Sequence, residues 1–264
     1  MTDYTHLLED ILKEVRSTSR FIKSQVTEVS TTDIEEKELN SLVSYVDKEA
    51  EKQLVNGLGA LIQNAGFITE EDTREKTIKE YTWIIDPLDG TTNFLNQVPH
   101  FAISVALQKD GKTVLGVVKE VNSGEEWTAI LSQGAFLDGK RIRVNSKSFH
   151  DILVATGFPY SNDHDYEAYF GVLKHWLTRT RGLRRLGSAA LDLCFVACGR
   201  LGAYYEATLN AWDVAAGALI VQEAGGKVSD FSAGEDYLFG REILAANPLV
   251  YDEVLNVIQS HLKK

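Results

Sequence analysis

Apolar residues recur at intervals of three and four positions in two stretches of the N-terminal half. The first stretch has Leu7, Leu8, Ile11, Leu12 and Val15. The second has Leu42, Val43, Val46, Ala50, Leu54, Leu58, Leu61 and Ile62. This spacing gathers the apolar side chains on one face of a helix, so it predicts two amphipathic helices, the second ending near Gly66.

Shorter, continuous apolar runs come next and predict β-strands. They cover residues 81–85, 103–107 and 114–118. Asp110-Gly111 stands between the last two runs and predicts a hairpin, because both residues tolerate the left-handed backbone of a tight turn. Asp138-Gly139-Lys140 predicts a further turn.

Strands and helices alternate in the second half. The predicted strands cover residues 151–156, 183–186 and 203–206, and the predicted helices cover residues 166–176, 191–198 and 214–224. Gly225-Gly226 supplies a normal helix stop. The segment at residues 145–150 is polar and aperiodic, so we divide the chain into an N-terminal α+β half, 1–146, and a C-terminal α/β half, 147–264. This mixture predicts a layered fold of the α+β or α/β class.

The composition is that of an ordinary globular chain with an acidic balance. Of its 264 residues, 44% are hydrophobic and 25% are charged. The net charge of −11 disfavours direct binding to nucleic acid or to an anionic membrane. No apolar run approaches the ~18 residues of a membrane span, and residues 1–6 do not resemble a signal peptide. We therefore expect a cytoplasmic protein.

The two cysteines, Cys194 and Cys198, lie four residues apart in an apolar helical segment. A disulfide at this spacing in a helix would be strained, and a zinc site lacks further ligands nearby. We interpret them as core thiols.

The most informative segment surrounds two aspartates after the apolar run at residues 81–85. Asp86 and Asp89 are separated by Pro87 and Leu88, and residues 90–93 resemble a helix start. Carboxylates suited to a cation therefore lie beside backbone N–H groups suited to an anion. An ordinary strand-to-turn transition with solvated aspartates is the alternative.

Three further acidic positions have both an ordinary and a functional interpretation. Glu70-Glu71-Asp72 could be a solvated loop, and Asp213 after Trp212 could cap a helix. Asp47 falls on the apolar stripe of the second helix. A buried charge there is costly unless it is paired or bound to a metal, which favours a cation site over a buried ion pair with lysine.

In combination these segments resemble the inositol monophosphatase family. The resemblance rests on Asp86-Pro87-Leu88-Asp89-Gly90-Thr91, with Glu70-Glu71 before it and Trp212-Asp213-Val214-Ala215 after it. Gly187-Ser188-Ala189-Ala190 and Tyr204-Tyr205-Glu206 also match. The resemblance covers nearly the whole chain. It implies an α-β-α-β-α sandwich of the sugar phosphatase type with two pseudo-domains, a homodimer, Mg²⁺ dependence and lithium sensitivity.

The resemblance also implies the ligands of two metal ions. Glu70, Asp86 and the backbone carbonyl of Leu88 would hold the first ion. Asp86, Asp89 and Asp213 would hold the second. All of these donors are oxygens, which suits Mg²⁺ and not zinc. Two ions about 3.5–4 Å apart would clamp the attacking and leaving oxygens, and they would let an acidic protein accept a phosphate dianion.

Catalytic and substrate-binding roles follow from the same resemblance. Asp47, Glu70 and Thr91 would position the attacking water, and the substrate would be a small phosphorylated polyol, most simply myo-inositol monophosphate. The implied substrate-binding residues are Gly90, Thr91, Gly187, Ser188, Ala189, Glu206, Asp89 and Asp213. The sequence departs from the family pattern at Thr69, Ser41, Tyr45-Val46 and Asn210, which makes the substrate rim less predictable than the metal site.

Two alternative functions remain open at this point. Relatives with the same metal core hydrolyse fructose-1,6-bisphosphate, histidinol phosphate or adenosine 3′,5′-bisphosphate. Some bacterial members bind the transcription machinery, and Arg184-Arg185-Leu186-Gly187 is similar to their sequence. We interpret the other basic and aromatic positions as ion pairs, subunit contacts or packing: Arg179, Arg181, Arg184, Arg185, His100, His164, His175 and Trp127.

Overall fold

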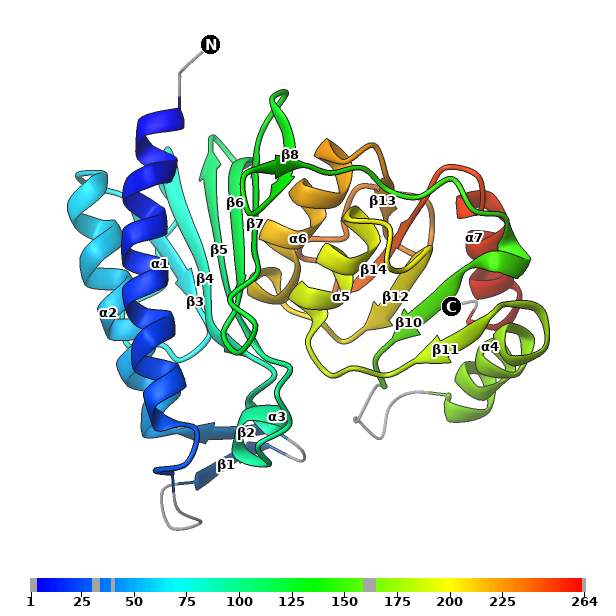
Figure 1. The fold of residues 1–264 in the computed structure, drawn as a ribbon, viewed down its shortest axis with the longest axis horizontal. Helices are drawn as coiled ribbons and strands as arrows, with labels where there is room; N and C mark the ends of the chain where they lie inside the picture. The colour runs from blue at the N-terminus through cyan, green and yellow to red at the C-terminus, as the bar shows by residue number, and fades with distance from the viewer. Residues whose placement is uncertain (1–3, 30–33, 39–40, 159–164, 263–264) are drawn as a thin grey trace.

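The computed structural model describes residues 4–29, 34–38, 41–158 and 165–262, and it shows five layers in the order helix, sheet, helix, sheet, helix (Figure 1). This confirms the α-β-α-β-α fold. The helices of the described residues are α1 (Thr5–Gln25), α2 (Tyr45–Leu61), α3 (Thr91–Leu95), α4 (Tyr166–Arg179), α5 (Ala189–Ala197), α6 (Ala211–Glu223) and α7 (Tyr251–His261).

A seven-stranded sheet forms the second layer, and α1 and α2 cover its outer face (Figure 1). Its strands, in spatial order, are β3 (Gly66–Thr69), β4 (Tyr81–Asp89), β5 (Ala102–Lys109), β6 (Lys112–Glu120), β7 (Glu126–Ile130), β8 (Gly134–Leu137) and β9 (Lys140–Arg141). Only the β3–β4 pair is parallel among these described strands. The predicted hairpin is confirmed, because Asp110 and Gly111 join β5 to β6 with φ of 50° and 77°.

A five-stranded sheet forms the fourth layer, with α4 and α7 on its outer face (Figure 1). Its strands, in spatial order, are β11 (Gly182–Arg184), β10 (Leu153–Thr156), β12 (Ala203–Ala207), β14 (Glu242–Ala246) and β13 (Lys227–Ser229). β10 pairs in parallel with both neighbours, whereas β14 pairs antiparallel with β12 and β13. A separate antiparallel pair consists of β1 (Ile34–Glu38) and β2 (Ser41–Ser44).

The middle layer consists of α5 and α6. Because helices cover both faces of the seven-stranded sheet, its strands are apolar on both sides and not only on one. In β4, Trp83 and Ile85 pack toward α1 and α2, while Ile84 packs toward α5 and α6. The sheet face toward α6 carries small residues, so the helix lies very close. A Cβ atom at Gly116 would be 2.9 Å from the carbonyl oxygen of Ala216. One apolar core therefore joins the two sheets.

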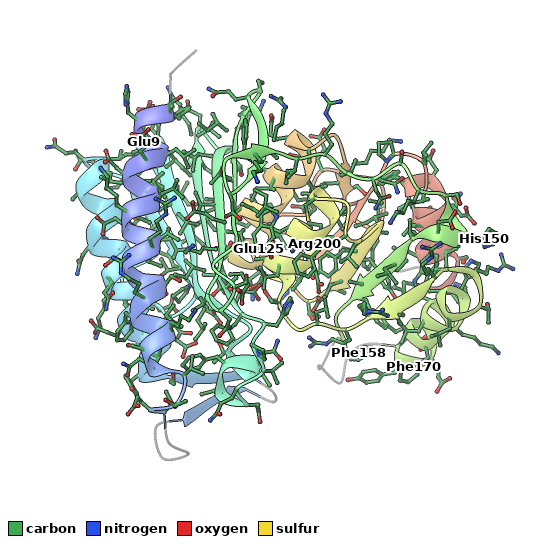
Figure 2. The ribbon with its side chains drawn as sticks, in the orientation of Figure 1. Glu9, Glu125, His150, Phe158, Phe170 and Arg200 are labelled. Atoms are coloured by element: carbon green, nitrogen blue, oxygen red, sulfur yellow. The ribbon has the colours of Figure 1, made fainter. Side chains whose placement is uncertain are left out.

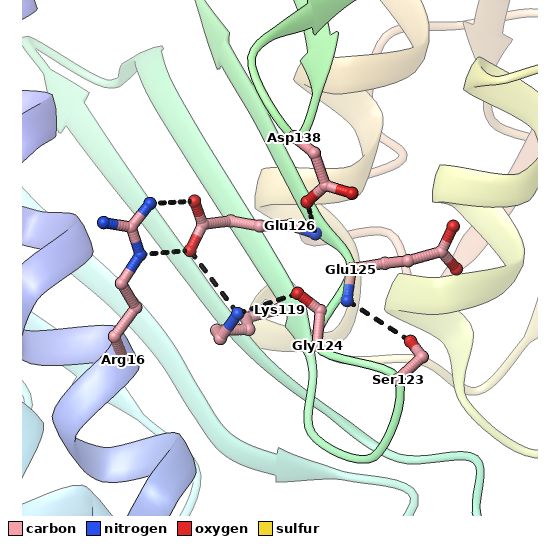
Figure 3. A network of polar contacts seen from close by, with 7 residues as sticks. All are labelled: Arg16, Lys119, Ser123, Gly124, Glu125, Glu126 and Asp138. Carbon is pink, nitrogen blue, oxygen red and sulfur yellow. Dashed lines mark hydrogen bonds and ion pairs between the residues drawn. The ribbon is translucent and has the colours of Figure 1, made fainter.

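The residues at the turn from β6 into β7 form ion pairs with both the outer and the middle helical layer. Glu126 accepts two hydrogen bonds from Arg16 on α1, over 2.9 and 2.6 Å, and Lys119 Nζ lies 3.6 Å from the same carboxylate (Figure 3). Its neighbour Glu125 pairs instead with Arg200, just after α5 (Figure 2). Adjacent acidic residues thus connect this turn to α1 on one side and to the middle layer on the other.

Several predicted element boundaries differ from the observed ones. The helix predicted from Leu42 begins at Tyr45, because Ser44 caps it and residues 41–44 form β2. The strand predicted from residue 151 begins at Leu153, after a 3-10 turn at Phe149–Asp151. The strand predicted over residues 183–186 is β11. The division at 146/147 stays a prediction; it falls between the strands of the two sheets, whose cores are continuous through α5 and α6.

Two simpler expectations concern thiols and membrane spans. Cys194 is buried, Cys198 is partly buried, and both thiols are free, which confirms that they are core cysteines. None of the helices in the described ranges combines the length and the apolar character that crossing a bilayer would require. His164 lies outside the described residues.

Candidate functional site

The two aspartates of the central motif are fixed by irregular strand pairing. β4 extends beyond the predicted end at residue 85, so both carboxylates belong to the strand. The register with β5 is broken between Asp86 and Asp89, where Pro87 has no N–H to donate to a sheet ladder. Within this irregularity the Leu88 N–H donates to Asp86 Oδ1 over 2.9 Å.

Gly90 makes the turn from β4 into α3. Its φ is 94°, a left-handed conformation that glycine adopts without steric cost. A Cβ atom there would lie 3.1 Å from the carbonyl oxygens of both Gly187 and His100. α3 then starts at Thr91, which confirms the predicted helix start after the aspartates.

A cavity of about 560 Å³ lies at this turn. It is lined by Glu70, Asp86, Leu88, Asp89, Gly90, Thr91, Thr92, Asn93, Phe158, Arg185, Leu186, Gly187 and Asp213. The five predicted metal ligands are all in this lining, although they come from three separate parts of the chain. Asp47, Ser188, Ala189 and Glu206 are not part of it.

Asp89 is held by the N-terminus of α5. It accepts hydrogen bonds from the Ser188 hydroxyl and from the backbone N–H groups of Ala190, over 2.8 Å, and Ala189, over 3.3 Å. Ser188 also caps α5. Ser188 and Ala189 therefore support a cavity carboxylate in this structure, and their predicted contact with substrate stays a prediction.

Asp213 has a structural role in α6 as well as a place in the cavity. It occupies the third helical position and accepts the backbone N–H of Asn210 over 2.6 Å, as part of a reciprocal capping box. The residue that caps the helix is Asn210. Asp213 therefore does take part in capping α6, as the sequence suggested. The same residue also lines the cavity.

Thr91 is positioned by a buried acid from α2. Its hydroxyl lies 2.9 Å from Asp47 Oδ1 and 3.0 Å from the Leu88 carbonyl oxygen. Asp47 is 1% exposed and also accepts the Ser44 N–H and hydroxyl, over 2.9 and 2.7 Å. These hydrogen bonds satisfy the carboxylate that the sequence placed on an apolar stripe.

The cavity carboxylates disfavour one another's ionised forms. Burial raises the pKa of Asp86 well above its usual range, and the nearby charges of Glu70, Asp89 and Asp213 raise it further. Burial raises the pKa of Asp89 to about 6, against the lowering effect of its bonds to α5. Burial, then the charge of Asp89, raises the pKa of Asp213 to about 7. Such a cluster needs protons or a cation to be stable.

These residues fit a hard divalent cation by the chemistry of their donors. Glu70 and Asp213 are both within hydrogen-bonding reach of Asp86, and every side chain of the cluster offers oxygen, as Mg²⁺ prefers. Among the described residues, no three acidic, histidine or cysteine side chains already surround one point as metal ligands. Asp86, Asp89 and Asp213 instead accept hydrogen bonds from protein donors, some of which a cation would have to displace.

Glu206 is not among the residues that line the cavity. Tyr204 donates its hydroxyl to Glu206 Oε2 over 2.6 Å, and burial raises the pKa of Glu206 to about 7. Gly157 leaves room for this carboxylate, because a Cβ atom there would lie 1.8 Å from it. The positive charge of Arg185 lowers the pKa of the same group.

Arg185 and Phe158 are cavity residues that were not expected from the sequence. Arg185, which we interpreted as an ion-pair or subunit residue, lines the cavity, with its guanidinium 5.9 Å from the Phe158 ring. The ion-pair interpretation does hold for Arg181, which bonds Asp151 over 2.9 Å. The sequence carries no signal that separates these arginines, because all of them flank one short strand.

Asp192 is a buried acid that sequence patterns also missed. It is 1% exposed, and its Oδ1 has no hydrogen-bond partner. Burial, then the charges of Glu206 and Asp89, raise its pKa well above the usual range. Its position in the first turn of α5 had suggested only an apolar core helix.

We expect Asp192→Asn to stabilise the protein near neutral pH by at least about 1 kcal/mol, because asparagine avoids the cost of ionising a buried carboxylate that lacks a hydrogen-bond partner. A raised folded-state pKa means that stability is complete at low pH and is lost as the unfolded chain ionises above pH ~4. Asparagine removes that loss. Unfolding in denaturant at pH 4 and pH 7.5 should show the gain only at the higher pH. Asp110→Asn in the exposed hairpin is the control, and an equal effect at both pH values would contradict the interpretation.

Comparison with known proteins agrees with this geometry. The sequence profile of the inositol monophosphatase family matches residues 4–263. Similar relatives include the Nus factor SuhB of Pseudomonas aeruginosa, 38% identical over 97% of each chain, and that of Escherichia coli K12, 36% identical over 97% of each chain.

Solved structures give the same result. The extragenic suppressor protein SuhB of Bartonella henselae has a TM-score of 0.90 at 34% identity, covering 97% of this chain and 99% of that one. The IMPase of Thermotoga maritima has a TM-score of 0.90 at 31% identity, covering 98% and 99%. With the motifs of β4 and α6 in one cavity and a match along nearly its whole length, the chain belongs to the inositol monophosphatase family.

Proposed function

We propose that this protein is a Mg²⁺-dependent phosphomonoesterase that hydrolyses the phosphate ester of a small polyol, with myo-inositol monophosphate as the first substrate to test. The observation that carries the proposal is the single cavity lined by Glu70, Asp86, Leu88, Asp89 and Asp213, directly beside the helix start at residues 90–93. That arrangement offers oxygen ligands and backbone N–H donors to one phosphate group.

The residues around the reacting phosphate would divide the work. Bound Mg²⁺ would neutralise phosphate charge and activate water. Glu70 would accept the proton of the attacking water, and the Thr91 hydroxyl, fixed by Asp47, would orient that water. The N–H groups of Gly90 and Thr91 would bind phosphate oxygens. No covalent intermediate is needed, since phosphoryl transfer mainly requires positioning and charge neutralisation.

The polyol would lie against Arg185 and Gly187, which line the cavity. Glu206, held by the Tyr204 hydroxyl, would accept a polyol hydroxyl from outside that lining. Carboxylates of Asp89 and Asp213 could also accept substrate hydroxyls. A neutral, hydroxyl-rich leaving group suits this mixture of acceptors better than a purely apolar one.

The first test is metal dependence. We expect hydrolysis of myo-inositol monophosphate to vanish in excess chelator and to return when Mg²⁺ is restored, because the carboxylate cluster needs a cation to receive a phosphate dianion. A panel with fructose-1,6-bisphosphate, histidinol phosphate and adenosine 3′,5′-bisphosphate measures the preference by kcat/KM. Undiminished hydrolysis in chelator would contradict the proposal, and a preferred panel ester would change the substrate but not the chemistry.

The relatives named Nus factor favour a second candidate function, association with the transcription machinery. This role would not require turnover. Affinity capture from lysate with the wild-type chain and with Asp86→Asn separates the two functions, because only catalysis depends on that carboxylate. The homodimer, the cytoplasmic location and lithium sensitivity also stay predictions.

A further inference from the structure

Helix α2 carries two buried acids one turn apart. Asp47 is 1% exposed and Glu51 is not exposed at all. Residues four apart lie on the same helix face, and here the two carboxylates serve different segments. Asp47 bonds Thr91, whereas Glu51 bonds the loop that follows β3. One rigid helix therefore contacts both segments that supply the proposed water-positioning residues.

Glu51 is fully engaged by that loop. It accepts the Glu71 N–H over 2.6 Å at Oε2, and the Thr73 N–H and hydroxyl over 2.8 and 2.7 Å at Oε1. A buried carboxylate is tolerated only when hydrogen bonds replace its water, and these three donors meet that need. Hydrogen bonds to an ionised acceptor are also stronger than neutral ones. The loop is thus tied to α2 directly after Glu70.

The backbone of Glu70 is consequently held from both sides. On one side Thr69 ends β3, paired in parallel with Ile85 of β4. On the other side the next N–H, that of Glu71, is bonded to Glu51. The Glu51 carboxylate therefore anchors the loop directly after Glu70.

We propose that Glu51 is a positioning residue that sets the Glu70 carboxylate against Asp86 and Thr91. It acts through the loop at residues 70–73 and does not itself line the cavity. The proposal rests on the phosphatase function proposed above and adds to it the residue that places the proton acceptor. Outer partners of this kind affect metal affinity or activity by ~10–100-fold.

Glu51→Gln is the direct test. Glutamine keeps the shape but offers one carbonyl oxygen and turns an NH₂ toward an N–H donor. We expect kcat to fall about 10-fold or more, the Mg²⁺ concentration for half-maximal activity to rise, and KM for the ester to change little. Glu49→Gln, on the same helix with Lys52 at 3.9 Å as its ion-pair partner, is the matched control and should behave as wild type.

The decisive measurement is the same substitution made in a Glu70→Gln background. If Glu51 acts through Glu70, its substitution should have little further effect on kcat there, because coupled residues are not additive. A full, additive loss in that background would show a merely structural role and overturn the proposal. Unchanged kcat and Mg²⁺ response in Glu51→Gln alone would overturn it as well.

Two readouts do not depend on turnover and keep this test separate from the proposed function. Amide hydrogen exchange of a peptide covering residues 66–76 should accelerate in Glu51→Gln, and Mn²⁺ binding followed by calorimetry should weaken. If Glu51→Gln does not fold, Thr73→Val removes one donor and should give the same changes at smaller size. Thr73→Ser keeps the hydroxyl and should behave as wild type. A wild-type protein without Mg²⁺-dependent hydrolysis would refute the phosphatase function, whereas unaltered exchange and Mn²⁺ binding would refute the role of Glu51.

Discussion

Replacing Asp213 by asparagine should abolish most of the turnover and leave the protein folded. The Oδ1 atom of the new asparagine can still accept the Asn210 N–H. The capping box at the start of α6 therefore keeps its bond between the N-cap backbone and residue 213. The variant loses one negative charge from the cavity. The proposed function makes Asp213 a metal ligand. Its substitution should therefore lower kcat/KM by more than the ~10–100-fold expected for an outer partner of a ligand.

The same substitution at another helix start provides the control. Asp165 caps α4 by accepting the Ala168 N–H over 3.0 Å, and it is not in the cavity lining. Asp165→Asn should therefore leave steady-state kinetics unchanged. Thermal unfolding without metal should show Asp213→Asn at least as stable as wild type, because the cluster carries less repulsion. Near-normal turnover of Asp213→Asn would remove Asp213 from the site.

Glu70→Gln should reduce kcat about 10²-fold or more, the size expected when a proton acceptor is lost. Glutamine preserves the length of the side chain and can still contact Asp86, so KM for the ester should change much less than kcat. The relevant measurement is the full dependence of rate on ester concentration at saturating Mg²⁺. A large rise in KM with unchanged kcat would assign Glu70 to binding alone.

Glu75, exposed in the same loop, supplies the comparison for that result. Glu75→Gln makes the identical chemical change a few residues away, outside the cavity lining. It should retain wild-type kinetics. If both variants lost activity equally, the loop as a whole, and not the Glu70 carboxylate, would be responsible.

Sequence patterns predicted the parts of this molecule in which local signals agree with packing. The continuous apolar run of β4 and the Asp-Gly hairpin after β5 are confirmed, because each has one physically consistent interpretation. Helix and strand ends were less predictable. Leu42 and Val43 continue the helical spacing, but the Ser44 cap and its bonds to Asp47 start α2 later.

The candidate site was predictable in its motifs but not in its supporting contacts. Asp86 and Asp213 could be recognised from their neighbours in sequence. Glu51 could not, although its spacing of four from Asp47 on a buried stripe is a signal that could be sought. Arg185 and Ser188 lie in the segment that leads into α5, which contacts Asn93 and Asp89 from the other half. Sequence spacing carries no information about such contacts.

The shared helical layer also limits how this protein can move. Many enzymes with two halves admit ligands by hinge rotation about a few connecting residues. Here α6 packs so tightly on β6 that Gly116 has no room for a side chain, and Asp89 of one half bonds the N-terminus of α5 in the other. Rotation would have to break an apolar core and open these bonds together. On the proposed function, we therefore expect a substrate to reach the cavity without rotation of the two halves.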